Sequence, residues 1–208
     1  MSAQPREPLI KFVRKLGRPV FTTREVSALA GKSLSVTTQG LRYLAEQGIL
    51  IKVRRGLWAE ADGDRLNAFS LIPYLAPGHR AYVSFLSALH LHGIIEQIPQ
   101  VITIASTAHT KTIRTRIGTY RIHRISPAFF AGFDWNGPER AYLLASPEKA
   151  LVDSLYLSAH RKSQYRNFPE LEFPRSFSFG KARQWARRIP AERVRAIVLR
   201  ELARISEL

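Results

Sequence analysis

The sequence predicts an α+β protein in which an N-terminal winged helix-turn-helix domain precedes a mixed α/β domain with a helical tail. Three observations lead to this prediction. Within residues 1–60, three helix patterns are followed by two strand patterns. Residues 63–160 mix helix and strand patterns, and residues 180–205 contain two further helix patterns. Because 45% of the 208 residues are hydrophobic, the chain can bury a core.

The first three elements are expected to be helices that end at glycines. Residues 9–17 place apolar side chains at i, i+3, i+4 and i+7, which indicates a short amphipathic helix. In residues 22–31, Thr22 and Glu25 form a capping-box pattern, and Gly31 stands where a helix stop is expected. Residues 33–48 form the third pattern, with a predicted core stripe made of Thr37, Gly40, Leu41 and Leu44.

A two-stranded wing is predicted next. Residues 49–53 and 56–60 have strand patterns, and two arginines and a glycine join them. Three helices followed by a hairpin form the winged helix-turn-helix layout, and residues 31–33 supply the tight turn between the second and third helices. An Asp-Gly-Asp break at 62–64 then separates two predicted domains, a DNA-binding domain over 1–62 and an α/β domain over 63–208.

The second domain is expected to mix helices and strands. A helical pattern over 65–76 is broken by Pro73, and another over 83–92 ends at Gly93. Residues 100–106 indicate a buried strand, and residues 112–126 a hairpin centred on Gly118. The segment 145–159 predicts a helix with Ser146 as N-cap and Pro147 at its first position. Two helices, over 180–188 and 191–205, complete the tail.

Side chains on the outer face of the third helix are the strongest candidates for DNA contacts. This helix is expected to lie in the major groove, and the wing at an adjacent minor groove or its phosphates. Gln39 suits adenine, Arg42 suits guanine or phosphate, and the methyls of Val36 suit a thymine methyl. Helix N-termini also offer free N–H groups to phosphate. The candidate DNA-contacting residues are Thr22, Thr23, Arg24, Ser35, Val36, Thr38, Gln39, Arg42, Tyr43, Lys52, Arg54 and Arg55.

The net charge of +16 favours polyanionic partners, with nucleic acid first and an anionic membrane second. Residues 1–60 contain eleven Lys and Arg against four Asp and Glu, and residues 161–208 contain twelve against five. No apolar run is long enough to span a bilayer and no signal peptide is predicted. The absence of Cys excludes disulfides and cysteine-based zinc sites, and a cytoplasmic location is expected.

The arginines of the two C-terminal helices form a second candidate basic surface. Two interpretations stay open, a solvated helix face or a second nucleic-acid surface that binds either more operator DNA or RNA such as tRNA. The residues concerned are Arg183, Arg187, Arg193, Arg200 and Arg204.

No catalytic set, metal site or cofactor is predicted, so the chain is not expected to be an enzyme. His90 and His92 are two residues apart, which directs them to different helix faces. Ser146 and Lys149 are close enough to suggest a Ser/Lys pair, but a helix start explains the serine. A nuclease metal site would need acids in a compact spacing with lysine, and the four candidate acids lack it: Asp134, Glu139, Glu148 and Asp153.

Four stretches, 22–59, 81–94, 101–107 and 145–157, make the chain resemble the AbiEi-type antitoxins of bacterial type IV toxin–antitoxin systems. The resemblance implies a winged helix that represses its own operon by binding inverted repeats in double-stranded DNA. It also implies a C-terminal domain that counteracts a nucleotidyltransferase-like toxin without forming a stable complex. Two copies would occupy the repeats, with the free protein a monomer or weak dimer.

Two other classes of function stay open from the residues alone. One is an RNA-binding or tRNA-binding factor, or a nucleic-acid enzyme, that the winged helix only positions. The other is a protein-interaction module, because winged helices also bind proteins. The excess of Lys and Arg, and an outer face of the third helix on which Glu46 is the sole acid, favour DNA.

Overall fold

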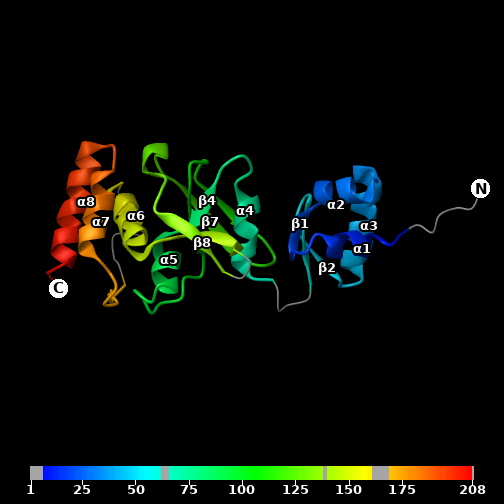
Figure 1. The fold of residues 1–208 in the computed structure, drawn as a ribbon, viewed down its shortest axis with the longest axis horizontal. Helices are drawn as coiled ribbons and strands as arrows, with labels where there is room; N and C mark the ends of the chain where they lie inside the picture. Colours follow the sequence, from blue (N-terminus) through cyan, green and yellow to red (C-terminus); the bar gives the residue numbers. More distant parts are fainter. Residues whose placement is uncertain (1–6, 62–65, 138–139, 161–168, 208) are drawn as a thin grey trace, which may run out of the picture. The chain divides into compact units, whose positions relative to one another are not determined.

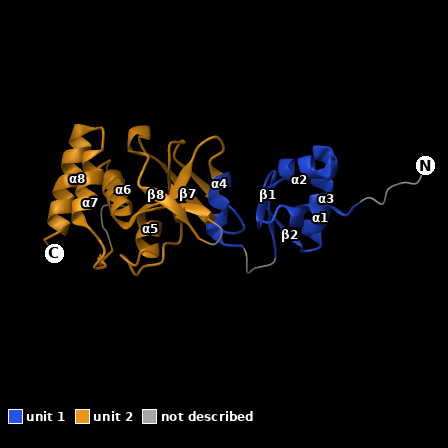
Figure 2. Cartoon of the chain, viewed as in Figure 1, with its two compact units in different colours: residues 1–74, 115–117 blue, residues 75–114, 118–208 orange. Residues whose placement is uncertain are grey.

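The computed structural model describes residues 7–61, 66–137, 140–160 and 169–207 (Figure 1). The chain divides into two compact units (Figure 2). Unit 1 comprises residues 1–74 and 115–117, and unit 2 comprises residues 75–114 and 118–208. The predicted α+β class is confirmed, with helices and a small sheet in the first unit and a larger sheet with C-terminal helices in the second.

Unit 1 is built from three helices and a three-stranded antiparallel sheet of order β1-β3-β2. Its elements are α1 (Leu9–Lys15), β1 (Val20–Thr22), α2 (Thr23–Ala30), α3 (Leu34–Glu46), β2 (Leu50–Arg54) and β3 (Leu57–Glu60). The strand β1 was not predicted. It has three residues, too few for a periodic pattern, and it forms by pairing with β3.

The core of unit 1 lies between the helices and the sheet. It contains the buried side chains of Val13, Phe21, Val26, Leu41, Leu44, Leu50 and Trp58. These residues come from α1, α2 and α3 and from all three strands, so burial of one apolar cluster fixes these helices on the sheet. Outside this cluster, a 3-10 turn η1 (Ala68–Leu71) runs into α4 (Ile72–Leu75). Pro73 lies in the first turn of α4, so it does not break a longer helix as predicted.

Unit 2 contains a mixed six-stranded sheet of order β6-β7-β5-β4-β9-β8. The strands are β4 (Ala81–Val83), β5 (Ile102–Ser106), β6 (Lys111–Arg114), β7 (Thr119–Arg124), β8 (Phe133–Asn136) and β9 (Tyr142–Ala145). The predicted hairpin is confirmed as the antiparallel pair β6–β7. The parallel pairs are β5 with β7 and β4 with β9, which join segments far apart in the sequence.

The helices that accompany this sheet in the described part of the unit are α5 (Phe85–Leu91), α6 (Pro147–Ala159), α7 (Phe179–Arg187) and α8 (Glu192–Ile205). A short turn η2 (Pro127–Phe129) precedes β8. The predicted start of α6 is confirmed, because the hydroxyl of Ser146 accepts a hydrogen bond from the backbone N–H of Lys149 at 3.2 Å. The helix α6 contacts α5, α7 and α8, so it is buried on nearly all sides and forms the centre of this unit (Figure 1).

Candidate nucleic-acid interface

The turn between α2 and α3 is fixed by local hydrogen bonds. Gly31 ends α2 in the left-handed conformation, with a φ of 62°. This conformation is unfavourable for residues that have a side chain. The hydroxyl of Ser27 donates to the carbonyl of Lys32 at 2.6 Å, which closes the turn. Ser33 then caps α3 by accepting from the backbone N–H of Val36 at 3.3 Å. The start of α3 is therefore set by its own sequence.

The outer face of α3 carries most of the predicted DNA-contacting side chains in an exposed position. Ser35, Val36, Gln39, Arg42 and Tyr43 are all exposed, while the opposite face buries the predicted core stripe at Thr37, Leu41 and Leu44. Thr38 is half-buried, and its hydroxyl donates to the carbonyl of Leu34 at 2.6 Å. The hydroxyl of Thr38 is thus used within the helix.

Leu34 is an exposed residue of this face that the sequence prediction missed. It lies seven residues before Leu41 and three before Thr37, so helical spacing alone places it on the core stripe. Half of its side-chain surface is nevertheless exposed, because the core of unit 1 does not reach the first turn of α3. Its exposure could have been expected from the sequence, because Leu34 directly follows the helix cap Ser33 and so lies at the end of the helix.

The three candidate DNA-contacting residues at the N-terminus of α2 differ in their exposure. The predicted capping box is confirmed, since Thr22 accepts from the backbone N–H of Glu25 and the Glu25 carboxylate accepts from that of Thr22. Thr23 is buried, and its hydroxyl oxygen accepts from Trp58 Nε1 at 2.8 Å. Arg24 is exposed. Of these candidates, only Arg24 has a fully outward side chain.

The three wing candidates also differ in their surroundings. The guanidinium of Arg54 is half-buried and donates to the carbonyl of Tyr74, whose own hydroxyl donates to the carbonyl of Val20 at 3.0 Å. Lys52 is exposed, with its ammonium 6.0 Å from the ring centre of Trp58, and Arg55 is exposed at the turn. Neither Lys52 nor Arg55 forms an ion pair within the described part of the chain. Arg54 braces the base of the wing, and the other two cations face outward.

The C-terminal arginines do not form one continuous surface. All five candidates, Arg183, Arg187, Arg193, Arg200 and Arg204, are exposed. Arg183 donates to the hydroxyl of Ser206 at 3.3 Å, and Arg195 donates to the carbonyl of Ile189 at 2.8 Å, so Arg195 and Ser206 mark the side of α8 that faces α7. At about 100° per residue, the three candidates on α8 lie on a different side from these two.

A further basic region, distinct from the C-terminal arginines, lies on the hairpin β6–β7, and the sequence prediction overlooked it. Lys111, Arg114, Arg116, Arg121 and Arg124 are all exposed, and residues 97–133 contain no Asp or Glu. The acids of residues 61–160 lie on either side of this segment, so the net charge of the whole stretch is close to neutral.

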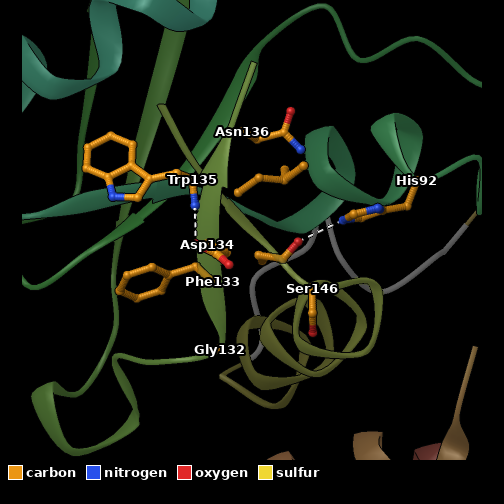
Figure 3. A pocket seen from close by; sticks show the side chains of 9 residues that line it. His92, Gly132, Phe133, Asp134, Trp135, Asn136 and Ser146 are labelled. Carbon is orange, nitrogen blue, oxygen red and sulfur yellow. Dashed lines mark hydrogen bonds between the residues drawn. The ribbon is translucent and has the colours of Figure 1, made fainter. Parts of the chain in front are cut away.

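Unit 2 has a shallow pocket of about 370 Å³ beside β8 and β9 (Figure 3). The ring N–H of His92 donates to the carbonyl of Ala145 at 2.7 Å, and Asn136 and Ser146 lie at the rim. His90 bonds in the same way to the carbonyl of Ile95, at 3.3 Å. No group of three His, Asp or Glu side chains that could hold a metal ion occurs among the described residues, and Glu139 lies outside them.

The candidate pair Ser146 and Lys149 is not formed, because Lys149 is directed into the core. Its ammonium makes an ion pair with Asp153, donates to the hydroxyl of Tyr82 at 3.0 Å and lies 3.7 Å from the ring centre of Phe129. Lys149 and Asp153 are both completely buried. Burial lowers the pKa of Lys149, and the charge of Asp153 opposes that shift.

The helix-turn-helix, the capped outward-facing α3 and the hairpin β2–β3 define the fold of unit 1 as a winged helix-turn-helix, a class used widely in transcription regulators. Residues 7–61 match the family of AbiEi antitoxin transcriptional regulators. The match confirms the resemblance over this part of the chain, and the family is one of regulators and not of enzymes. No curated protein matches the chain. Within the described ranges, no helix has the length and apolar character needed to cross a membrane.

Proposed function

We propose that the protein is a DNA-binding transcriptional repressor and an antitoxin, which acts on the operator of its own operon. The observation that carries the proposal is the outer face of α3, where five predicted contact residues are exposed and Glu46, at the last position, is the sole acid. The family match over the same residues supports a regulatory role. A repressor works where the chromosome is, so the proposed location is the cytoplasm.

In the proposed complex, α3 lies in the major groove and the wing contacts the neighbouring backbone. Arg42 on α3 would contact guanine or phosphate, while Arg55, Lys52 and Arg24 neutralise phosphates. Arg54 holds the wing in place through the carbonyl of Tyr74 instead of contacting DNA. Two copies of the chain would bind the two halves of an inverted repeat, because each copy presents a single α3.

The test is a gel shift with the full-length chain and the DNA upstream of its own reading frame, repeated over a range of salt concentrations. Binding to that DNA should survive an excess of unrelated competitor duplex. The logarithm of the binding constant should fall linearly with the logarithm of salt, with a slope of about −0.9 for each phosphate neutralised. Equal affinity for operator and competitor at every salt concentration would refute the proposed repressor.

Single substitutions separate base contacts from phosphate contacts. Arg42→Ala should reduce the preference for the operator by about 1–3 kcal/mol at one base pair. Arg55→Ala should weaken all DNA sequences and lower the magnitude of the salt slope by about one. Arg54→Ala should leave the salt slope unchanged, because its guanidinium donates to the carbonyl of Tyr74 and is not proposed to neutralise a phosphate. An unchanged salt slope in Arg55→Ala would remove the wing tip from the interface.

The antitoxin role is tested by co-expression. We expect a nucleotidyltransferase-like reading frame next to the gene for this chain, and growth arrest caused by that protein should be relieved by the full-length chain. Relief without co-purification of the two proteins would support action without a stable complex. If the neighbouring protein is toxic and the chain does not relieve its toxicity, the antitoxin role is refuted and only the repressor role remains.

Binding of RNA is the second candidate function, favoured by the exposed arginines along α8. A tRNA pool used as competitor in the same gel shift distinguishes it. Competition by tRNA that is lost in the variant Arg193→Gln/Arg200→Gln/Arg204→Gln, with operator binding retained, would place RNA on α8.

A further inference from the structure

The first turn of α3 exposes two aliphatic side chains, in the part of the helix where base contacts are expected. They are two residues apart, so they lie on different sides of the helix. Leu34 is 50% exposed and Val36 is 54% exposed. Both residues lie within the first three positions of a helix that begins at Leu34. In helix-turn-helix proteins, residues near the N-terminal end of this helix contact base edges. An aliphatic pair at this place is therefore a feature of the candidate interface.

Two hydroxyl groups near the start of α3 already form hydrogen bonds inside the protein. Ser33 accepts a hydrogen bond from the backbone N–H of Val36, and Thr38 donates its hydroxyl to the carbonyl of Leu34. Because this proton is donated to the carbonyl of Leu34, Thr38 cannot also donate it to a base, and its methyl group is the apolar contact that it offers. Ser35 is the one exposed residue of the turn whose side chain can form a polar contact with a base. The turn is consequently poor in groups that distinguish bases by hydrogen bonds.

The major groove displays only one prominent apolar group, the C5 methyl of thymine. We propose that Leu34, Val36 and the methyl of Thr38 pack against thymine methyls, so that the first turn of α3 selects thymine by apolar contact. This inference rests on the proposed binding of DNA by α3. Discrimination between bases by hydrogen bonds is then left to the next turn of α3, where Gln39 and Arg42 are exposed. The preferred half-site then has thymine at the positions beside the first turn.

The test replaces thymine by deoxyuridine, which removes the C5 methyl and leaves every hydrogen-bonding group in place. The probe is the duplex that the full-length chain enriches from a random-sequence pool, with each thymine exchanged in turn. Fluorescence anisotropy at one fixed salt concentration gives the dissociation constant of each duplex. At one or two positions, the exchange should weaken binding by the wild-type chain about fourfold, the equivalent of one buried methyl-sized group.

Variants assign this methyl contact to side chains. In Val36→Ala or Leu34→Ala, the duplexes with thymine and deoxyuridine should bind equally at the position that each side chain contacts. Folding should be unimpaired, since alanine has the highest helix propensity and both sites are exposed. Ile49→Ala is the matched control, because Ile49 is 44% exposed but follows the opposite end of α3. It should keep the full fourfold difference.

The outcomes separate this inference from the function on which it rests. If no sequence is enriched from the pool, the proposed function fails. If a sequence is enriched but no deoxyuridine exchange changes the affinity of the wild-type chain, DNA binding stands and the thymine contact is refuted. If the exchange weakens the wild-type chain and both α3 variants by the same factor, the assignment to Leu34 and Val36 is refuted.

Discussion

Replacing Lys149 by methionine should destabilise unit 2 severely. Lys149 is the cationic partner of Asp153, and both side chains are completely buried. Methionine has a similar length and helix propensity, so the substitution removes the charge with little change in helix stability. The carboxylate of Asp153 would keep two donors, the hydroxyls of Tyr82 at 2.9 Å and Ser84 at 2.7 Å, but no counter-charge.

The magnitude follows from the cost of an uncompensated buried charge. Removing one partner of a buried ion pair costs about 3–5 kcal/mol. For a chain of this size, each kcal/mol lowers the melting temperature by about 2–4 °C, so the expected decrease is roughly 6–20 °C. Tyr82→Phe removes one hydrogen bond to the same carboxylate and leaves the ion pair intact, so it should cost less, about 1.5–3 kcal/mol.

The assay is urea unfolding followed by circular dichroism, with the melting temperature measured in parallel. The matched control is Lys181→Met, which makes the same chemical change at an exposed position of α7. Its effect should stay within about 0.5 kcal/mol. The expected order of destabilisation is thus Lys149→Met, then Tyr82→Phe, then Lys181→Met.

A loss of less than about 1 kcal/mol in Lys149→Met would refute this reasoning. It would mean that the carboxylate of Asp153 is tolerated without a counter-charge at little cost, and that the site is not closed as its burial indicates. A loss in Tyr82→Phe that equals the loss in Lys149→Met would instead attribute the stability to the hydrogen bond of the tyrosine.

Three further predictions concern stability. Thr23→Val should cost about 1–3 kcal/mol, because it leaves the buried indole N–H of Trp58 without an acceptor, whereas Thr23→Ser keeps the oxygen; urea unfolding compares the two. Gly31→Ala should cost about 1–2 kcal/mol, since the φ of 62° disfavours a side chain, while Gly180→Ala in α7 should be neutral or stabilising in the same thermal melt. Burial raises the pKa of four tyrosines, so the folded chain keeps protons that the unfolded chain releases above pH 10. Their contribution makes the free energy of unfolding fall as the pH rises from 10 to 11, which urea titrations at several pH values would detect; an increase over that range would contradict it. The tyrosines are Tyr74, Tyr82, Tyr142 and Tyr156.

Elements with a local signal were predicted well from the sequence. The capping box of Thr22 and Glu25, the stop at Gly31 and the cap at Ser146 each depend on residues within one helical turn of each other. The strands β1, β4, β8 and β9, of three or four residues each, were not predicted, whereas the equally short β3 and β6 were predicted as parts of hairpins. The strands β1 and β4 pair with strands distant in the sequence, and no local pattern encodes such a partner.

The candidate interface was predicted in outline, and its details depend on tertiary contacts. The exposed face of α3 followed from helical periodicity. The same periodicity could not reveal that Thr23 faces Trp58, or that Arg54 is held by the carbonyl of Tyr74. The burial of Lys149 and Asp153 was likewise beyond it. Their i, i+4 spacing allows an ion pair on any helix, but only the packing of other helices around α6 removes that pair from solvent.

The open sheet of unit 2 leaves two outer strands, β6 and β8, available for pairing with another chain. Both are only four residues long, and exposed charges lie on them, at Lys111 and Arg114 on β6 and at Asp134 on β8. A net charge of +16 adds mutual repulsion between copies. Electrostatics that suit a nucleic-acid partner therefore also keep the sheets of different molecules from joining edge to edge. Concentrated salt, or a polyanion that neutralises the charges of β6, would weaken this repulsion. Aggregation through the edges of the sheet would then be favoured.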